Sequence, residues 1–313
     1  MSAKLINNAN DFLGASETRY FSNGYKQVHY SCIQSTIDKG QLNGVMRIDI
    51  NSGSLSSISH LGAIEYTAIA CNVCEQLLRK EYNLMDHEIA ASWIRCCFLK
   101  IKEPVDINKN KEVSVHGKIV DLKQSEMSIN GYISKLEIRI GNAIVKIEVD
   151  HPVRLWFKLL FWESKGQNIC NLHIDGYKQR IHQITDICLN TEKKTCDASV
   201  EIIEKKKNYQ GIGAKYRTTL LADIINVSGQ LSQVLLYTLE GITRKCANNM
   251  WLREFSINYL EPSETLYYPV KITFDRFDKI KIRNEDWRSV HLTSHLGEIQ
   301  ANFKITHKIL TSK

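Results

Sequence analysis

Two apolar stretches decide the fold: HLGAIEYTAIACNVCEQLL at residues 60–78 and LLADIINVSGQLSQVLLYTL at residues 220–239. Each has the length of an ordinary helix, contains few charged residues and is apolar on nearly every side. A helix that is apolar all round is buried in a domain and does not lie on its surface. The sequence therefore predicts two buried central helices.

The two stretches belong to an internal repeat, because residues 63–104 align without a gap on residues 221–262. The positions that the two copies share are Trp93 with Trp251, Arg95 with Arg253, Glu103 with Glu261, and Pro104 with Pro262. The sequence GYKQ, at residues 24–27, also recurs at residues 176–179. A repeat that keeps the order of its elements indicates two copies of one structural unit.

Each predicted helix is followed by segments in which apolar and polar residues alternate, which is typical of half-buried strands. These segments are residues 93–102, 112–122, 132–140 and 143–149 in the first copy, and residues 251–259, 266–274, 290–295 and 299–309 in the second. A long helix followed by an antiparallel sheet is an α+β arrangement, and a sheet wrapped around one such helix is a hotdog.

We therefore predict an α+β tandem (double) hotdog, in which an antiparallel sheet wraps a long central helix in each unit. We expect an N-terminal hotdog over residues 1–152 and a C-terminal hotdog over residues 176–313. Residues 153–175 are the expected linker or crossover. Two such units in one chain form a pseudo-dimer, so the protein is expected to be a monomer of this kind or a homodimer.

The composition excludes several classes of protein. No stretch of the 313 residues is long, apolar and uncharged enough to span a membrane, and the first residues lack the apolar core of a signal peptide. The nine cysteines are odd in number, which argues against a disulfide framework. We expect a cytoplasmic protein without a membrane span.

Charged and metal-binding residue types are dispersed along the chain. The net charge is +7, but the lysines and arginines do not form the dense basic stripe with interleaved aromatics that nucleic-acid binders carry. The pair Cys71 and Cys74 has no second pair at the spacing of a zinc site. We expect no nucleic-acid partner, no metal and no cofactor.

Short motifs near the start of the chain resemble the beginning of the avirulence D protein (AvrD) family: FLG at residues 12–14, RYF at residues 19–21 and GY at residues 24–25. The chain length and the sequence GQL at residues 229–231 also fit. The resemblance implies a part in making syringolides, which are acyl glycosides built from a β-ketoacyl chain and a pentulose. The family is related to the A-factor biosynthesis hotdog proteins, which transfer a β-ketoacyl group to a small hydroxylated phosphate ester.

This resemblance implies an acyltransferase that joins a β-ketoacyl thioester to a small sugar or sugar phosphate. The thioester partner is carried by acyl carrier protein or by coenzyme A. Two other functions stay open, namely a non-catalytic acyl-binding module and a hotdog thioesterase or dehydratase. The His-x-x-x-Pro pattern of fatty-acid dehydratases is missing from both copies, which counts against a dehydratase.

Glu65 and Asp223 are the first candidates for catalysis, because they occupy equivalent positions near the start of the two apolar helices. A buried carboxyl group is costly unless it is paired or its pKa rises, and a raised pKa suits a general base near neutral pH. His60, five residues before Glu65, is a second candidate base or a helix cap. The alternative is that both acids only cap their helices. Between the two sites, we favour the one built around His60 and Glu65.

Three further residues are candidates for substrate binding. Asn226 and Gln230 lie one turn apart on the second predicted helix, where their amides can hold a thioester carbonyl or a pantetheine arm, or else satisfy each other. Arg217 precedes that helix and is a candidate contact for a phosphate or a carrier protein, or an exposed charge.

Overall fold

The structure is a computed structural model that describes residues 4–16, 19–50, 60–153, 170–205, 208–216, 219–244, 247, 250–258 and 265–309. Most of the predicted linker, residues 154–169, lies outside the described residues. Among the helices of the described part, none combines the length and hydrophobicity that crossing a bilayer requires.

The first half of the chain contains one long helix and most of its strands come after that helix. Its elements are β1 (Lys4–Asn8), α1 (Ala9–Leu13), η2 (Gly24–Gln27), β2 (Val28–Asp38), β3 (Gln41–Ile50), α2 (Ala63–Tyr82), α3 (Asp86–Ala91), β4 (Trp93–Ile101), β5 (Glu112–Gln124), β6 (Tyr132–Ile140) and β7 (Ala143–His151).

The second half repeats this order around a second long helix. Its elements are β8 (Cys170–Asn171), η3 (Leu172–Gly176), η4 (Tyr177–Gln179), β9 (Arg180–Asn190), β10 (Thr195–Glu204), β11 (Tyr209–Gln210), α4 (Leu221–Glu240), β12 (Met250–Asn258), β13 (Tyr267–Ile282), β14 (Glu285–Leu296) and β15 (Ile299–Lys308).

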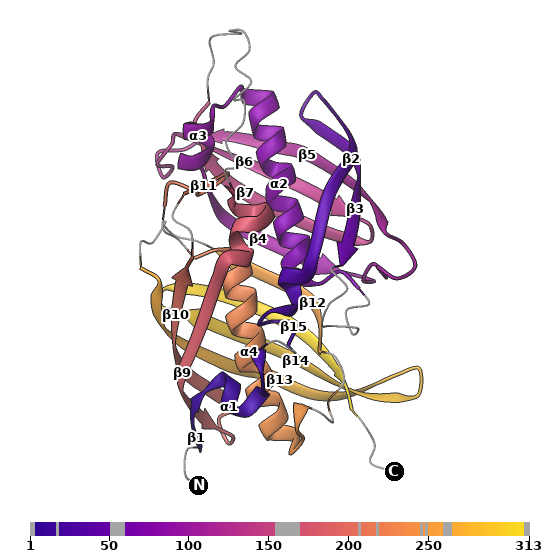
Figure 1. Cartoon of the computed structure of the whole chain (residues 1–313), viewed down its shortest axis with the longest axis vertical. Helices are drawn as coiled ribbons and strands as arrows, with labels where there is room; N and C mark the ends of the chain where they lie inside the picture. Colours follow the sequence, from indigo (N-terminus) through magenta and orange to yellow (C-terminus); the bar gives the residue numbers. More distant parts are fainter. Residues whose placement is uncertain are drawn as a thin grey trace.

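Thirteen strands form one sheet in the order β1-β9-β10-β13-β14-β15-β12-β4-β7-β6-β5-β3-β2. The two halves join where β4 pairs antiparallel with β12, with Lys100 opposite Glu254 and Cys96 opposite Asn258. From this junction outward, equivalent strands follow in the same order on both sides. The sheet curves around the two long helices, which lie end to end on one side of it (Figure 1). This is the α+β arrangement of a hotdog fold.

Both predicted helices are confirmed, with small shifts at their ends. The first begins at Ala63 and continues to Tyr82, and the second runs over Leu221–Glu240. They end where Asn83 and Gly241 adopt the left-handed conformation, a common way to end a helix. Their side chains are buried on nearly all sides, because the sheet covers one face and short elements such as η3 and α1 contact the helices as well.

The predicted strands are also present, but β13 and β14 are longer than the alternation indicated. We expected strands over residues 266–274 and 290–295, whereas the hairpin extends to a turn at Arg283 and Asn284. The added part is largely exposed and rich in charged residues, so it lacks the apolar and polar alternation that a buried face imposes.

The N-terminal residues, expected within the first unit, lie against the second half. Strand β1 pairs with β9, with Leu5 opposite Cys188, and α1 contacts α4. Phe21 packs on the same helix at Gly229, where a Cβ atom would lie 2.9 Å from the ring. The segment that follows α1 thus depends on a glycine in α4 for its position.

Helix α2 packs closely against its sheet at Gly117 of β5. A Cβ atom there would lie 2.6 Å from Cγ1 of Val73 and 3.1 Å from Cδ1 of Leu77, both on α2. We predict that Gly117→Ala lowers the free energy of unfolding by about 1–3 kcal/mol, the usual cost of overpacking a core. Chemical denaturation measures this change. Ser114→Ala, on the exposed face of the same strand, serves as the control. An unchanged stability of Gly117→Ala would contradict the described packing.

Candidate active site

The two predicted acids occupy the same place in the two long helices. Glu65 and Asp223 are each the third residue of their helix and are fully buried. Each accepts a hydrogen bond from the backbone N–H that precedes the helix: Gly62 N lies 3.0 Å from Glu65 Oε2, and Leu220 N lies 2.8 Å from Asp223 Oδ2. Both acids therefore cap a helix, as one of the interpretations from sequence held. Their other contacts differ.

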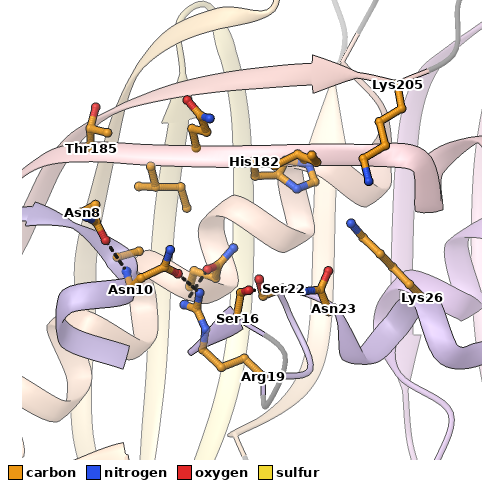
Figure 2. Close-up of a pocket in the computed structure, with 15 residues that line it drawn as sticks. Asn8, Asn10, Ser16, Arg19, Ser22, Asn23, Lys26, His182, Thr185 and Lys205 are labelled. Atoms are coloured by element: carbon orange, nitrogen blue, oxygen red, sulfur yellow. Dashed lines mark hydrogen bonds between the residues drawn. The ribbon is translucent and has the colours of Figure 1, made fainter. Parts of the chain in front are cut away.

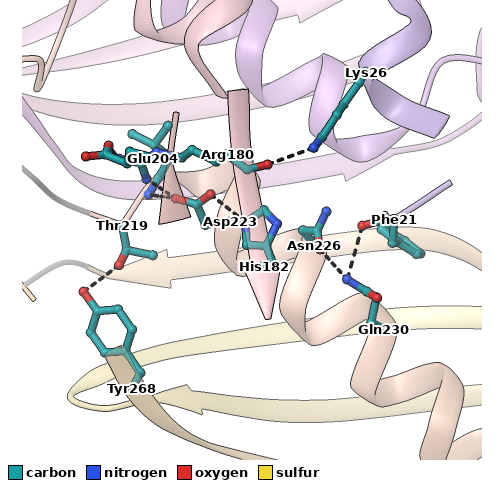
Figure 3. A network of polar contacts seen from close by, with 11 residues as sticks. Phe21, Lys26, Arg180, His182, Glu204, Thr219, Asp223, Asn226, Gln230 and Tyr268 are labelled. Carbon is teal, nitrogen blue, oxygen red and sulfur yellow. Dashed lines mark hydrogen bonds and ion pairs between the residues drawn. The ribbon is translucent and has the colours of Figure 1, made fainter. Parts of the chain in front are cut away.

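Asp223 is paired with two basic side chains of β9 (Figure 3). Arg180 forms an ion pair with it and a second ion pair with Glu204, and His182 Nε2 lies 2.8 Å from Asp223 Oδ1. Burial pushes the pKa of Asp223 up, but the charge of Arg180 and the contact with His182 outweigh it and hold the pKa at about 2. Asp223 is therefore ionised at neutral pH.

Among the described residues, no arginine forms an ion pair with Glu65. Its Oε2 accepts hydrogen bonds from the Tyr20 hydroxyl and from Gly62 N, whereas its Oε1 is buried and makes no hydrogen bond among the described residues. Burial raises the pKa of Glu65 to about 7, although these hydrogen bonds pull it down. Tyr20 lies directly over the start of the helix, since a Cβ atom on Gly62 would overlap its hydroxyl.

The two predicted amides of α4 contact each other and the N-terminal segment. Gln230 Nε2 donates to Asn226 Oδ1 at 2.7 Å and to the carbonyl of Phe21 at 3.3 Å. Its Oε1 accepts from Arg19 Nη1 at 2.9 Å, and Asn10 accepts from the other nitrogen of that guanidinium. Both amide protons of Gln230 are thus used within the protein, and the amide holds Arg19 in place.

Two equivalent tyrosines, one from each half of the chain, are in contact. Tyr25 and Tyr177, the second residues of the repeated GYKQ sequence, stack with ring centroids 6.0 Å apart. Burial raises the pKa of both hydroxyls, and for Tyr25 the nearby charge of Asp223 adds to the effect. The two copies of the GYKQ sequence therefore contact each other across the two halves of the chain.

A pocket of about 480 Å³ lies next to His182, which belongs to the cluster of Asp223, Arg180, His182 and Glu204 (Figure 2). Residues of the N-terminal segment and of β9 line it, and Gln230 of α4 lines it as well. His182 lines the pocket and also contacts Asp223. The imidazole of His182 thus connects the buried carboxylate of Asp223 to the pocket.

A family model described as "Pseudomonas avirulence D protein (AvrD)" matches residues 4–310. The chain belongs to the AvrD family. No curated protein matches this AvrD-family chain.

Several solved structures match the chain at low similarity. A conserved protein of unknown function with hot dog fold from Alicyclobacillus acidocaldarius is 7% identical with a TM-score of 0.43, covering 94% of this chain and 100% of that one. The acyl-CoA thioesterase II TesB2 from Mycobacterium marinum is 7% identical with a TM-score of 0.41, covering 90% and 97%. GphF Dehydratase 1 is 8% identical with a TM-score of 0.38, covering 89% and 98%. Similarities this low carry no argument about the AvrD-family protein.

The remaining predicted residues lie in other surroundings. His60 stacks on the ring of Trp251 with centroids 5.0 Å apart and pairs through its backbone with Asp106. Burial lowers the pKa of the His60 imidazole, which favours the neutral form. Arg217 lies outside the described residues. Of the predicted set, the structure brings Asp223, Asn226 and Gln230 together on one face of α4.

The sequence reasoning missed His182, which contacts the buried acid and faces the pocket. One signal was present: His182 follows the second GYKQ sequence, residues 176–179, by three positions and so lies close after a repeated motif. The equivalent position after the first GYKQ sequence holds Tyr30, which donates to the backbone carbonyl of His173 instead. The two halves therefore differ in the chemistry that they place beside their helix acids.

The environment of Glu65 predicts a measurable pH dependence of stability in this AvrD-family protein. Because its pKa rises from 4.5 to about 7 on folding, the folded state keeps a proton that the unfolded chain has lost. The contribution of Glu65 to stability is greatest below pH 4.5 and falls by about 3 kcal/mol as the pH rises to about 7, at 1.36 kcal/mol per unit. We predict that Glu65→Gln removes this fall in the free energy of unfolding, measured by urea denaturation across the range.

The matched control is Asp223→Asn at the equivalent position. Its carboxyl is already ionised above pH 4.5, because its pKa is about 2. This variant should lose stability by the same amount at every pH of the range, since Arg180 loses one of its charged partners. A fall in stability of unchanged size in Glu65→Gln would show that Glu65 is not the titrating group.

Proposed function

We propose that this AvrD-family protein is an acyltransferase that joins a β-ketoacyl thioester to a small sugar or sugar phosphate, with the two halves of the chain acting as a tandem hotdog. The observation that carries the proposal is the pair of Asp223 and His182, of which the imidazole lines a pocket of about 480 Å³. Membership of the AvrD family supports the same reaction.

His182 is the proposed general base. Ionised Asp223 can only accept hydrogen bonds, so Nε2 of His182 carries the proton that it donates and Nδ1 is left to take another. Within the described residues Nδ1 of His182 makes no hydrogen bond. An acceptor hydroxyl bound in the pocket can therefore give its proton to Nδ1.

The proposed step conserves atoms and charge. The hydroxyl oxygen attacks the thioester carbonyl carbon while its proton moves to His182 Nδ1. The bond between that carbon and sulfur then breaks, and the leaving thiolate takes the proton from the imidazolium. The products are an acyl ester of the sugar and a free thiol, and His182 returns to its neutral form.

The charges around His182 support this role. Asp223 is ionised, and its carboxylate lies 2.8 Å from Nε2 of His182. This negative charge stabilises the imidazolium that forms when Nδ1 takes up a proton. A buried carboxylate that holds an imidazole in one tautomer and stabilises its charged form serves the same purpose in serine hydrolases.

The geometry favours the second helix over the site around His60 and Glu65 that the sequence suggested. The Tyr20 side chain lies against Glu65, and the ring of His60 lies on Trp251. Asp223, by contrast, has a basic partner that lines a pocket. We propose that the Glu65 site is structural and the Asp223 site is catalytic.

The variant His182→Gln tests this assignment. Glutamine can still donate to Asp223 but cannot accept a proton, so we predict a loss of acyl transfer of about 100-fold or more, the lower range for a general base. Mass spectrometry measures the acylated product formed from a β-ketoacyl thioester and a pentulose or its phosphate. His60→Gln is the control and should retain turnover. Retained turnover in His182→Gln with loss in His60→Gln would reverse the assignment.

The same assay separates the other candidate functions. A thioesterase would release thiol from the acyl thioester without a sugar, whereas an acyl-binding module would bind the thioester and release none. We expect thiol release only when the acceptor is present. Thiol release that is equal with and without acceptor would replace the transferase proposal by a hydrolase.

A further inference from the structure

The pocket beside His182 is strongly basic. Arg19, Lys26 and Lys205 line it together with His182, and no carboxylate is among the described residues that do so. Asparagine, serine and threonine side chains supply most of its other polar groups. A pocket with several cations, many neutral hydrogen-bonding groups and no acid suits an anionic, hydroxylated ligand.

Arg19 is a buried residue that lines the pocket. Arg19 is only 2% exposed, and its guanidinium donates to Gln230 and Asn10. These contacts fix the plane of the guanidinium and keep a permanent positive charge beside the pocket.

The two lysines reach the pocket from opposite sides (Figure 2). Lys26 comes from η2, and its Nζ donates to the carbonyl of Arg180 at 2.8 Å. Lys205 follows β10, and the two ammonium groups point toward each other in the close-up. Like charges placed together repel, so this arrangement costs free energy until an anion lies between them.

We propose that Lys26 and Lys205, supported by Arg19, bind a phosphate group carried by a substrate. This inference rests on the proposed function, because it places the phosphate in the pocket that His182 faces. The phosphate belongs either to the acceptor, as a sugar phosphate, or to the donor, as the phosphopantetheine arm of its thioester. Both ligands present the same anionic group to the lysines.

The surroundings of Lys26 predict that phosphate binding is accompanied by proton uptake. Burial and the charge of Lys205 lower the pKa of Lys26 to about 8, although Asp223 raises it. The other charged or titratable groups that line the pocket are Arg19 and His182. A bound phosphate favours the charged ammonium, so its arrival raises the pKa of Lys26 and draws a proton from solution. Binding at pH 8 should therefore take up protons.

Calorimetric titration with inorganic phosphate at pH 8 tests the site without any turnover. The apparent enthalpy of binding should change with the ionisation enthalpy of the buffer, which reports proton uptake. We expect Lys26→Gln to bind phosphate at least about tenfold more weakly, as for loss of one charge-assisted contact, and to lose the buffer dependence. Lys205→Gln should also weaken binding. Lys193→Gln, at an exposed position in the turn after β9, should match the wild type.

Circular dichroism spectra that match the wild type will establish that each variant is folded. Phosphate binding of equal strength in Lys26→Gln and wild type would overturn the proposal, and so would the lack of binding to the wild type. His182→Gln should still bind phosphate. A failure of the proposed reaction is thus distinguishable from a failure of this site.

Two further pairs of ligands identify the source of the phosphate. A pentulose phosphate compared with the free pentulose tests the acceptor, and pantetheine phosphate compared with pantetheine tests the donor. Tighter binding of the phosphorylated member in one pair, lost in Lys26→Gln, assigns the phosphate to that substrate. If neither phosphorylated compound binds more tightly than its parent, the proposal is wrong.

Discussion

The ion pair between Asp223 and Arg180 is the interaction on which the candidate site depends. A carboxylate at the start of a fully buried helix is costly in free energy unless a cation compensates its charge. Arg180 supplies that cation from β9, and it also forms an ion pair with Glu204. Since β9 also carries His182, the strand that neutralises the acid brings the imidazole to the pocket.

The two halves of the fold shift the pKa values of two equivalent acids in opposite directions. After the first GYKQ sequence, the position of Arg180 is held by Val28, so the first half has no guanidinium at that place. Glu65 instead contacts the Tyr20 hydroxyl, and burial raises its pKa to about 7. Carboxyl groups in related positions whose surroundings move their pKa values apart are expected to serve different purposes. Here both acids cap a helix, and Asp223 also forms ion pairs with Arg180 and His182.

Much of the architecture could be predicted from sequence, because it follows from hydrophobic periodicity and the repeat. The two long helices, their acids and the strands that follow them depend on local patterns that are visible along the chain. The contact of His182 with Asp223 could not be predicted in this way, since it joins a strand to a helix that begins about 40 residues later. The pairing of β1 with β9 could not be predicted either, because the five residues of β1 show no pattern that indicates which strand they pair with.

A titration of the carboxyl carbons of Glu65 and Asp223 by NMR tests the central claim most directly. Selective ¹³C labelling of glutamate and aspartate, with Glu65→Gln and Asp223→Asn to assign the two signals, follows each carboxyl as the pH is lowered. The account predicts that Glu65 takes up its proton near pH 7 and that Asp223 stays ionised down to about pH 2. Protonation of Asp223 at or above its ordinary value of 3.8 would contradict the ion pair and the role given to His182.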